Sequence, residues 1–167
     1  MSVTRLFDLL KYQLENFSQQ ASVNSRLEDG SWRSYSSGEI ADTAEKAAAG
    51  LLSLGLEPGD KVALVSYKNR PEWLIMDFAI QMAGMVSIPL YPTISIGEYE
   101  YILGEAEVKA AFCGTGDLYQ KLEAAAKSTP SLEHIFSFDR QPGRPFWEDM
   151  LDPRGVGKVE EVRQGIS

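Results

Sequence analysis

The chain has 167 residues, of which 44% are hydrophobic and 24% are charged, and its formal net charge is -8 at pH 7. The length suits about one domain with a real core, and the composition is that of an ordinary soluble globular protein. The negative charge disfavours nucleic acid, anionic membranes and bare polyanions such as ATP or CoA as partners. With one cysteine and one histidine, the chain can build neither an internal disulfide nor a Cys/His zinc site.

No segment of the sequence has the pattern of a membrane span or of a targeting signal. No run approaches the ~20 apolar residues of a membrane span, and no basic stretch followed by an apolar one stands at the N-terminus. We therefore expect a cytoplasmic protein without a transmembrane segment, in which Cys113 stays reduced.

The first elements that the sequence predicts are a helix and a hairpin. The helix runs from about Thr4 to Phe17, because apolar residues recur at helical spacing, at Leu6, Phe7, Leu10, Leu14 and Phe17. Its basic residues are too few for a membrane-surface helix, so we expect it to pack on the domain. Segments 21–27 and 32–35 then flank the turn signal Asp29-Gly30, which indicates an antiparallel hairpin.

A second helix is predicted from Ser36 to Gly55. Ser36 and Glu39 have the spacing of a capping box, in which each side chain bonds the backbone N–H of the other residue. The apolar side of this helix consists of Ile40, Ala44, Ala47, Ala48, Leu51 and Leu52. Its small alanines permit a close approach to a sheet.

The centre of the chain is predicted to form a strand followed by a helix. Pro58-Gly59-Asp60 predicts a turn, and the apolar run 61–65 that follows is typical of a strand buried on both faces. Asn69 and Glu72 have the spacing of a reciprocal cap for a helix over residues 73–83.

This central helix is apolar on nearly every side, with Asp77 as its one charge, so it must be covered on more than one face. Gly84 ends it, and a second short strand follows over residues 85–88. Pro89 and Pro92 are expected to stop that strand.

Two more helix-and-strand steps complete the pattern. Ser95 and Glu98 repeat the capping box, before a strand at 109–113. A second amphipathic helix then precedes a strand at 134–138. The buried stripes of the two helices are Tyr99, Ile102, Leu103 and Ala106 in the first, and Leu118, Leu122 and Ala125 in the second.

The predicted fold class is α/β. Because β-α-β connections are overwhelmingly right-handed, the strands near residues 61, 85, 109 and 134 should lie parallel in one sheet with helices packed on it. The N-terminal helix and the hairpin are added to this sheet. Residues 1–151 form the predicted domain, and residues 152–167 a linker or frayed tail in which Gly155 and Gly157 prevent regular structure.

Four candidates for chemistry each have a structural alternative. Gly114-Thr115-Gly116-Asp117 lies between a strand and a helix, where backbone N–H groups could hold a phosphate, but the segment lacks a phosphate-binding lysine and Asp117 would repel the anion. His134 has no nucleophile or carboxylate at a telling spacing. Cys113 ends an apolar strand, which favours an inert thiol. Trp73 and Arg70 could form a binding pair, but packing at a helix start explains both.

Pairs of acidic residues carry no metal site in this sequence. Glu28 with Asp29, and Glu105 with Glu107, are adjacent or two apart, so on a helix they would point to different sides. The interpretation is a set of solvated faces. We therefore assign no catalytic, cofactor-binding or metal-binding residue to this chain.

Three motifs, in order, give the sequence a family resemblance. They are the run Pro58 to Ala63, the run Asn69-Arg70-Pro71-Glu72-Trp73, and the run from Gly84 to Thr93. Together they resemble the N-terminal region of the AMP-forming acyl-CoA synthetases, in the superfamily of adenylate-forming enzymes. Pro89-Leu90-Tyr91-Pro92-Thr93 looks most like the long-chain fatty acid branch. The resemblance extends over roughly residues 4–151.

The resemblance implies that the parent enzyme uses ATP, Mg²⁺ and CoA to convert a fatty acid into acyl-CoA, AMP and pyrophosphate. The family supplies its phosphate clamp from a Ser/Thr/Gly-rich loop that ends in Lys, a later acidic segment and a Lys of a mobile C-terminal domain. None of these matches a position here, and Gly155-Val156-Gly157-Lys158 lacks the hydroxyls. The resemblance thus implies an N-terminal scaffold, inactive alone, whose partner is the rest of the parent polypeptide and which could also self-associate.

Two other hypotheses remain open at this point. The chain could be a self-contained interaction module that shares the α/β sheet, or a small flavodoxin-like enzyme. The gene downstream of codon 167 separates the first hypothesis from the scaffold, and flavin absorbance tests the second.

Overall fold

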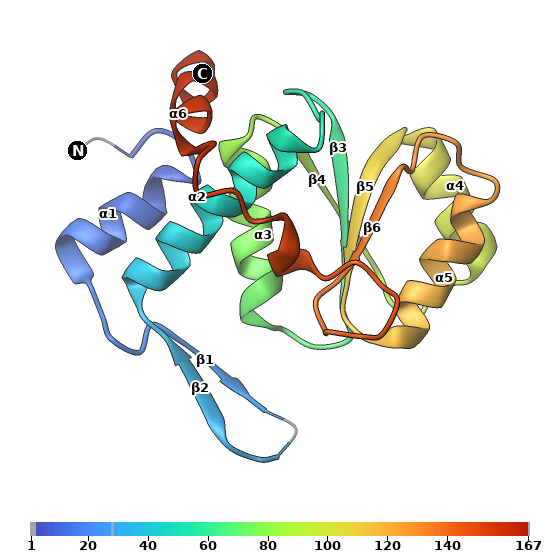
Figure 1. Cartoon of the computed structure of the whole chain (residues 1–167), viewed down its shortest axis with the longest axis horizontal. Helices are drawn as coiled ribbons and strands as arrows, with labels where there is room; N and C mark the ends of the chain where they lie inside the picture. The colour runs from blue at the N-terminus through green and yellow to red at the C-terminus, as the bar shows by residue number, and fades with distance from the viewer. Residues whose placement is uncertain (1–2, 28, 167) are drawn as a thin grey trace.

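The computed structural model describes residues 3–27 and 29–166. It contains a two-stranded antiparallel sheet and a four-stranded sheet with helices on both faces (Figure 1). The elements in chain order are α1 (Asp8–Phe17), β1 (Val23–Arg26), β2 (Trp32–Tyr35), α2 (Ser37–Ser53), β3 (Lys61–Val65), α3 (Pro71–Met82), β4 (Val86–Leu90), α4 (Ile96–Glu105), β5 (Val108–Cys113), α5 (Gly116–Ala126), β6 (His134–Ser137), the 3-10 turn η1 (Trp147–Met150) and α6 (Val156–Gly165).

The larger sheet confirms the predicted α/β class. Its strands lie in the order β4-β3-β5-β6, and all three neighbouring pairs are parallel. Successive residues of β3 alternate between two cores, since Val62 and Leu64 belong to one and Ala63 and Val65 to the other. Figure 1 shows α4 and α5 on one side of the sheet and α2 and α3 on the other. The sheet is therefore covered on both faces, as the unbroken apolar run of β3 predicted.

The capping boxes predicted at Ser36 and at Ser95 are present. Ser36 accepts a hydrogen bond from the Glu39 N–H and Glu39 accepts one from the Ser36 N–H, so α2 begins where the sequence predicted. Ser95 and Glu98 do the same at α4. Gly50 lets α2 approach η1, because a Cβ at this position would lie 2.1 Å from the Met150 carbonyl oxygen. The 3-10 turn η1 is thus packed tightly on α2.

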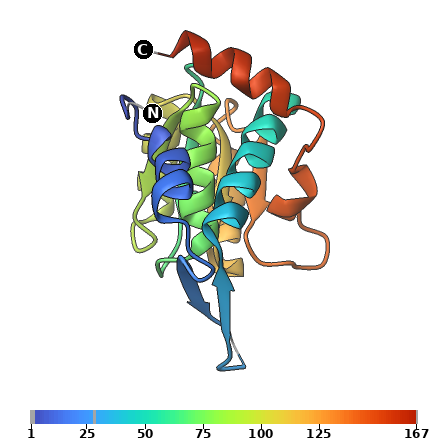
Figure 2. The ribbon, with the colours of Figure 1, turned by 90° about the vertical axis from the view of Figure 1, so that its left-hand side faces the viewer.

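The hairpin is also confirmed, and it projects from the body of the molecule (Figures 1 and 2). Val23 pairs with Tyr35 and Arg26 with Trp32. Tyr35 is buried at the base, whereas Trp32 is 67% exposed. The hairpin thus contacts the core at its base alone.

The N-terminal helix begins later than the sequence predicted, at Asp8 instead of Thr4. The Asp8 carboxylate is buried and accepts hydrogen bonds from the backbone N–H groups of Thr4 and Arg5, which holds residues 4–7 in a turn. Leu6 and Phe17, which were predicted to lie on the buried face, are 66% and 60% exposed. Phe7 of the same pattern is buried.

The start of α3 corrects the predicted cap at Asn69. The N-cap residue is Arg70, and no side chain caps the helix. Glu72 instead accepts a hydrogen bond from Nε of Arg70 at 2.9 Å. Pro71 occupies the first turn, where its missing N–H costs nothing.

Pro89 does not stop β4, which runs on to Leu90. The strand lies at an edge of the sheet, and proline is tolerated in edge strands because its missing N–H leaves no gap in the ladder. The predicted end of this strand at residue 88 is therefore wrong by two residues.

The tail is the largest correction. Residues 156–165 form α6, whereas the sequence predicted no regular structure from Pro153 onward. Val159 is 1% exposed, and Val162 and Ile166 pack against the core, so burial of this apolar side outweighs the helix cost of Gly157. Figure 2 shows α6 lying across the end of the helical layer. The proposed domain division at residue 151 remains a prediction.

Candidate functional site

The carboxyl ends of β3 and β5 form the topological switch point of the sheet. The two strands are neighbours, and the helices that follow them, α3 and α5, pack on opposite faces. Open α/β sheets bind ligands at such a point, because the loops diverge and leave a crevice. Here the two loops are residues 66–70 and Gly114-Thr115. These loops and their neighbours therefore define the candidate site.

Arg70 links the loop that follows β3 to the loop that follows β6. Its guanidinium donates to Glu72 at 2.9 Å and to both carboxylate oxygens of Asp139, at 2.9 and 3.2 Å. It also lies over the Phe138 ring, 5.3 Å from the centroid. Burial by itself lowers the pKa of Arg70, but the hydrogen bonds to Glu72 and Asp139 outweigh it and raise the pKa above its ordinary value. Two carboxylates thus already neutralise this cation.

The candidate phosphate cradle at Gly114 to Asp117 is filled by its own side chains. α5 begins at Gly116, and the Asp117 carboxylate in its first turn accepts hydrogen bonds from Thr115 Oγ1 and, at 2.6 Å, from Tyr67 Oη. The bond from Thr115 and the bond from Tyr67 lower the pKa of Asp117, so it stays ionised. A negative charge therefore already lies at this helix start, which favours the ordinary strand-to-helix turn.

The remaining sequence candidates lie apart from one another. Cys113 is fully buried in β5, and this burial raises the pKa of its thiol to about 12. His134 begins β6, at the amino end of the sheet, opposite the switch point. Glu105 and Glu107 are exposed, Asp29 accepts from Ser31 within the hairpin turn, and Glu28 lies outside the described residues. Over the described ranges, no group of three or more His, Cys, Asp or Glu side chains could hold a metal ion.

Trp73 lies between the core and a cavity. Neither the binding interpretation nor the packing interpretation therefore describes its surroundings completely. It is partly buried against the core, and it also lines a cavity of 390 Å³ beside the switch point together with Lys68 and Arg70. Sequence reasoning missed Lys68. The available signal was its place directly after a buried strand, where loop residues reach the carboxyl edge of a sheet.

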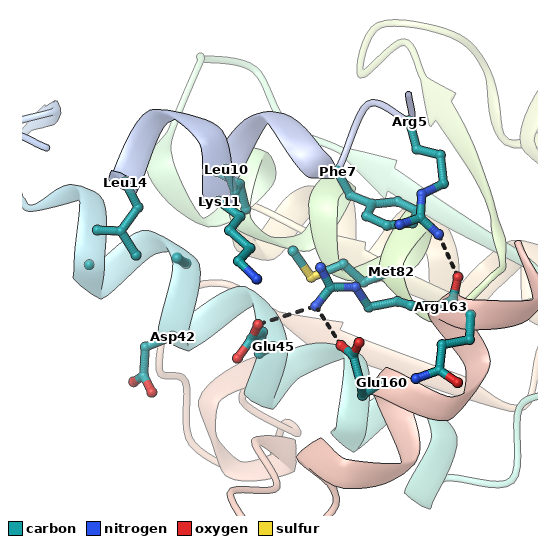
Figure 3. A pocket seen from close by; sticks show the side chains of 13 residues that line it. Arg5, Phe7, Leu10, Lys11, Leu14, Asp42, Glu45, Met82, Glu160 and Arg163 are labelled. Atoms are coloured by element: carbon teal, nitrogen blue, oxygen red, sulfur yellow. Dashed lines mark hydrogen bonds and ion pairs between the residues drawn. The ribbon is translucent and has the colours of Figure 1, made fainter. Parts of the chain in front are cut away.

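A second cavity, of 410 Å³, lies between α1, α2 and α6 (Figure 3). Its charged residues have both signs, and Arg163 pairs with Glu45 at 3.3 Å and with Glu160 at 3.4 Å. Because these charges compensate one another and the cavity lies away from the switch point, we assign it no chemistry.

The sequence comparisons give the family of the chain. Residues 10–159 match the model of the family described as AMP-binding enzyme. A long-chain-fatty-acid–CoA ligase, FadD15 of Mycobacterium bovis, is 34% identical over 113 residues, which are 68% of this chain and 19% of that protein. Long chain acyl-CoA synthetase 3 of Arabidopsis thaliana is 34% identical over 107 residues, 64% of this chain and 16% of that protein. The chain thus spans about a fifth or less of the length of these relatives.

Solved structures agree on the fold. A benzoate CoA ligase from Burkholderia xenovorans superposes with a TM-score of 0.70 at 21% identity, over 89% of this chain and 28% of that one. A coronafacic acid ligase from Pectobacterium brasiliense gives a TM-score of 0.74 at 18% identity, over 89% and 29% of the two chains. At these identities the likeness shows a shared fold alone.

The chain belongs to the AMP-binding enzyme family. Within that family it resembles the N-terminal part of the AMP-forming long-chain fatty acid CoA ligases, which confirms the resemblance inferred from its three motifs. None of the helices in the described part of the chain is long and apolar enough to cross a membrane.

Proposed function

We propose that this chain is the N-terminal scaffold of an AMP-forming long-chain fatty acid:CoA ligase. The observation that carries the proposal is the 34% identity over 113 residues to a long-chain-fatty-acid–CoA ligase. The parent reaction would convert fatty acid, ATP and CoA into acyl-CoA, AMP and pyrophosphate. The remainder of the parent polypeptide is the proposed partner, since the relatives are several times longer than this chain.

The proposed contribution of this segment is a rigid sheet edge on which the rest of the enzyme is built. The Arg70 network supports this role, because it fixes the loop that follows β3 to the loop that follows β6 at the switch point. An enzyme needs such fixed loops to hold its reacting groups in place. We propose the cytoplasm as the compartment, on the ground that the single, buried Cys113 has no disulfide partner in the sequence.

ATP, Mg²⁺ and CoA fit the parent and not the described residues of this segment. Phosphoryl chemistry needs cations at the developing charge, and Asp117 puts a carboxylate at the candidate cradle instead. We derive no catalytic step from this segment, and we propose that it is inactive alone.

The experiment that tests the proposal is to clone the gene with its downstream sequence and assay the longer product. We expect several hundred further codons, and palmitate-dependent release of pyrophosphate from ATP. A stop codon directly after codon 167, or a longer product that releases no pyrophosphate with any long-chain fatty acid, would overturn it.

A further inference from the structure

The hairpin receives less support from the rest of the chain than a two-stranded sheet needs. β1 and β2 project from the body of the molecule, and two large apolar side chains on them or beside them are exposed, Trp32 at 67% and Leu27 at 44% (Figures 1 and 2). A hairpin of two strands is marginally stable in water unless a third strand or a helix packs on it. The half of the hairpin away from the core therefore needs a further partner.

The hairpin has unpaired backbone groups along both of its outer edges. The Leu27 N–H donates to the Ser31 carbonyl oxygen at 2.8 Å, and from there the facing pairs alternate between those with and those without mutual hydrogen bonds. In the pairs without them, the N–H and C=O groups point away from the hairpin. The residues of these pairs are Asn24 and Arg26 in β1, and Trp32 and Ser34 in β2.

The two outer edges have different surroundings. The edge of β1 faces the body, because Val23 packs against the core and Asn24 lines the cavity of 390 Å³ beside the start of α3. In β2, the first three residues are exposed and Tyr35 alone is buried. The open edge of the hairpin is therefore that of β2.

The charge of β2 disfavours a second copy of this chain at that edge. Two β2 strands that both pair through Trp32 and Ser34 would place Arg33 directly opposite Arg33, and like charges in facing positions are destabilising. Arg33 has no ion pair with any described residue. A strand of different sequence is required, and the relatives, of which this chain spans 19% and 16%, have the length to supply one.

We propose that the β2 edge binds an extended strand of the parent polypeptide from outside residues 1–167, as the third strand of this sheet. The strand pairs with the backbone of Trp32 and Ser34, lays an apolar side chain against Trp32 and places an acidic side chain opposite Arg33. In strand addition of this kind, the main-chain hydrogen bonds give affinity and the side chains give specificity. The inference rests on the proposed function, since its occupant belongs to the parent polypeptide.

Hydrogen exchange of the Trp32 and Ser34 amides tests the proposal, in the 167-residue chain and in the longer product of the gene. We expect both amides to exchange as in an unfolded peptide in the 167-residue chain, and at least about tenfold more slowly in the longer product. Equally fast exchange in both proteins would overturn the proposal. Protection in the 167-residue chain that increases with its concentration would also overturn it, because the occupant would then be a second copy.

An assay of palmitate-dependent pyrophosphate release on the same preparation separates this inference from the proposed function. An active longer product with unprotected amides would reject the third strand and keep the ligase. Protected amides in an inactive product would reject the ligase and keep the third strand.

Two matched proline variants locate the edge. Ser34→Pro and Asn24→Pro each remove one outward N–H, and both remove the same hydrogen bond from Ser34 Oγ to Asn24 Oδ1, 2.7 Å long. In the longer product, Ser34→Pro should abolish protection of the Trp32 amide, and Asn24→Pro should leave it. The reverse result, or equal losses while the Arg33 amide stays protected by β1, would overturn the proposal. The wild-type comparison decides the matter where a variant fails to fold.

Discussion

The guanidinium of Arg5 donates hydrogen bonds to the backbone carbonyl oxygens of Arg163, at 2.5 Å, and of Ile166, at 3.2 Å. These carbonyls belong to the last turn of α6, where no intrahelical N–H is available and where a cation is favoured by the helix dipole. The same guanidinium pairs with Asp8 at 3.0 Å. Arg5 thereby ties the beginning of the described chain to its end (Figure 3).

This contact predicts that Asp8 stabilises the fold in a pH-dependent way. Hydrogen bonds from the Arg5 side chain lower the Asp8 pKa from 3.8 to about 2. Because the folded pKa is depressed, the stabilisation is present above pH 4 and is lost as the pH falls from about 4 to about 2. Asp8→Ala should lower the free energy of unfolding by about 1.5–3 kcal/mol at pH 7.

Urea denaturation of the wild type and Asp8→Ala between pH 7 and pH 2 measures this difference. The gap between the two proteins should shrink toward the acid end. A gap that stays constant over the whole range would show that the lost stability comes from packing and not from the ionised carboxylate.

Val159 tests whether α6 belongs to the folded unit. Its side chain is 1% exposed, so Val159→Ala should cost about 1–3 kcal/mol of stability, the scale of deleting two buried methyl groups. A frayed tail would respond within about 0.5 kcal/mol, as surface sites do. Hydrogen exchange of the α6 amides gives an independent reading, and exchange as fast as in an unfolded peptide would contradict the packed helix.

Trp73 is predicted to matter less for stability than Trp147. Truncation of a fully buried aromatic residue to alanine typically costs about 3–5 kcal/mol. Trp73 is partly buried, whereas Trp147 is 3% exposed and packs edge-on against Phe138. We now expect about 1–3 kcal/mol for Trp73→Ala and about 3–5 kcal/mol for Trp147→Ala. Equal losses in chemical denaturation would place Trp73 in the core after all.

The isolated chain is expected to self-associate at high concentration. Large apolar side chains are exposed at Leu6 in the turn before α1, at Phe17 in α1 and at Trp32 in β2. The open edge of β4 is a weaker candidate, since Pro89 has no N–H to offer a further strand. Sedimentation over a concentration series should show dimers or larger species. A monomer at every concentration, with no uptake of a hydrophobic dye, would contradict this expectation.

The parts of the fold that sequence predicted are those that local chemistry determines. The capping boxes at Ser36 and Ser95 require three-residue spacing alone, and the parallel sheet follows from alternating strands and helices. α6 was missed because its helix has Gly157 and few apolar residues, and its stability comes from Val159 packing on elements more than 70 residues away. The start of α3 likewise depends on a contact distant in sequence, since Arg70 is held by Asp139, which lies 69 residues further along the chain in the loop after β6.

The candidate site was even less accessible to sequence reasoning. Lys68 and Leu74 carry no motif, and the cavity that they line beside the switch point exists because the base of the hairpin lies beside the start of α3. Gly114 to Asp117 did carry a motif, and its weakness as a phosphate site was visible in Asp117, whose carboxylate accepts the bonds at the helix start.

We propose that this chain is a scaffold without its own nucleotide chemistry, and titration of the chain with ATP-Mg²⁺ tests this proposal most directly. We expect no saturable heat and, in the same sample with palmitate, no release of pyrophosphate. ATP binding tighter than ~100 µM would contradict the account, because that affinity needs about 5.5 kcal/mol of contacts, which a segment with Asp117 at its candidate cradle should not make.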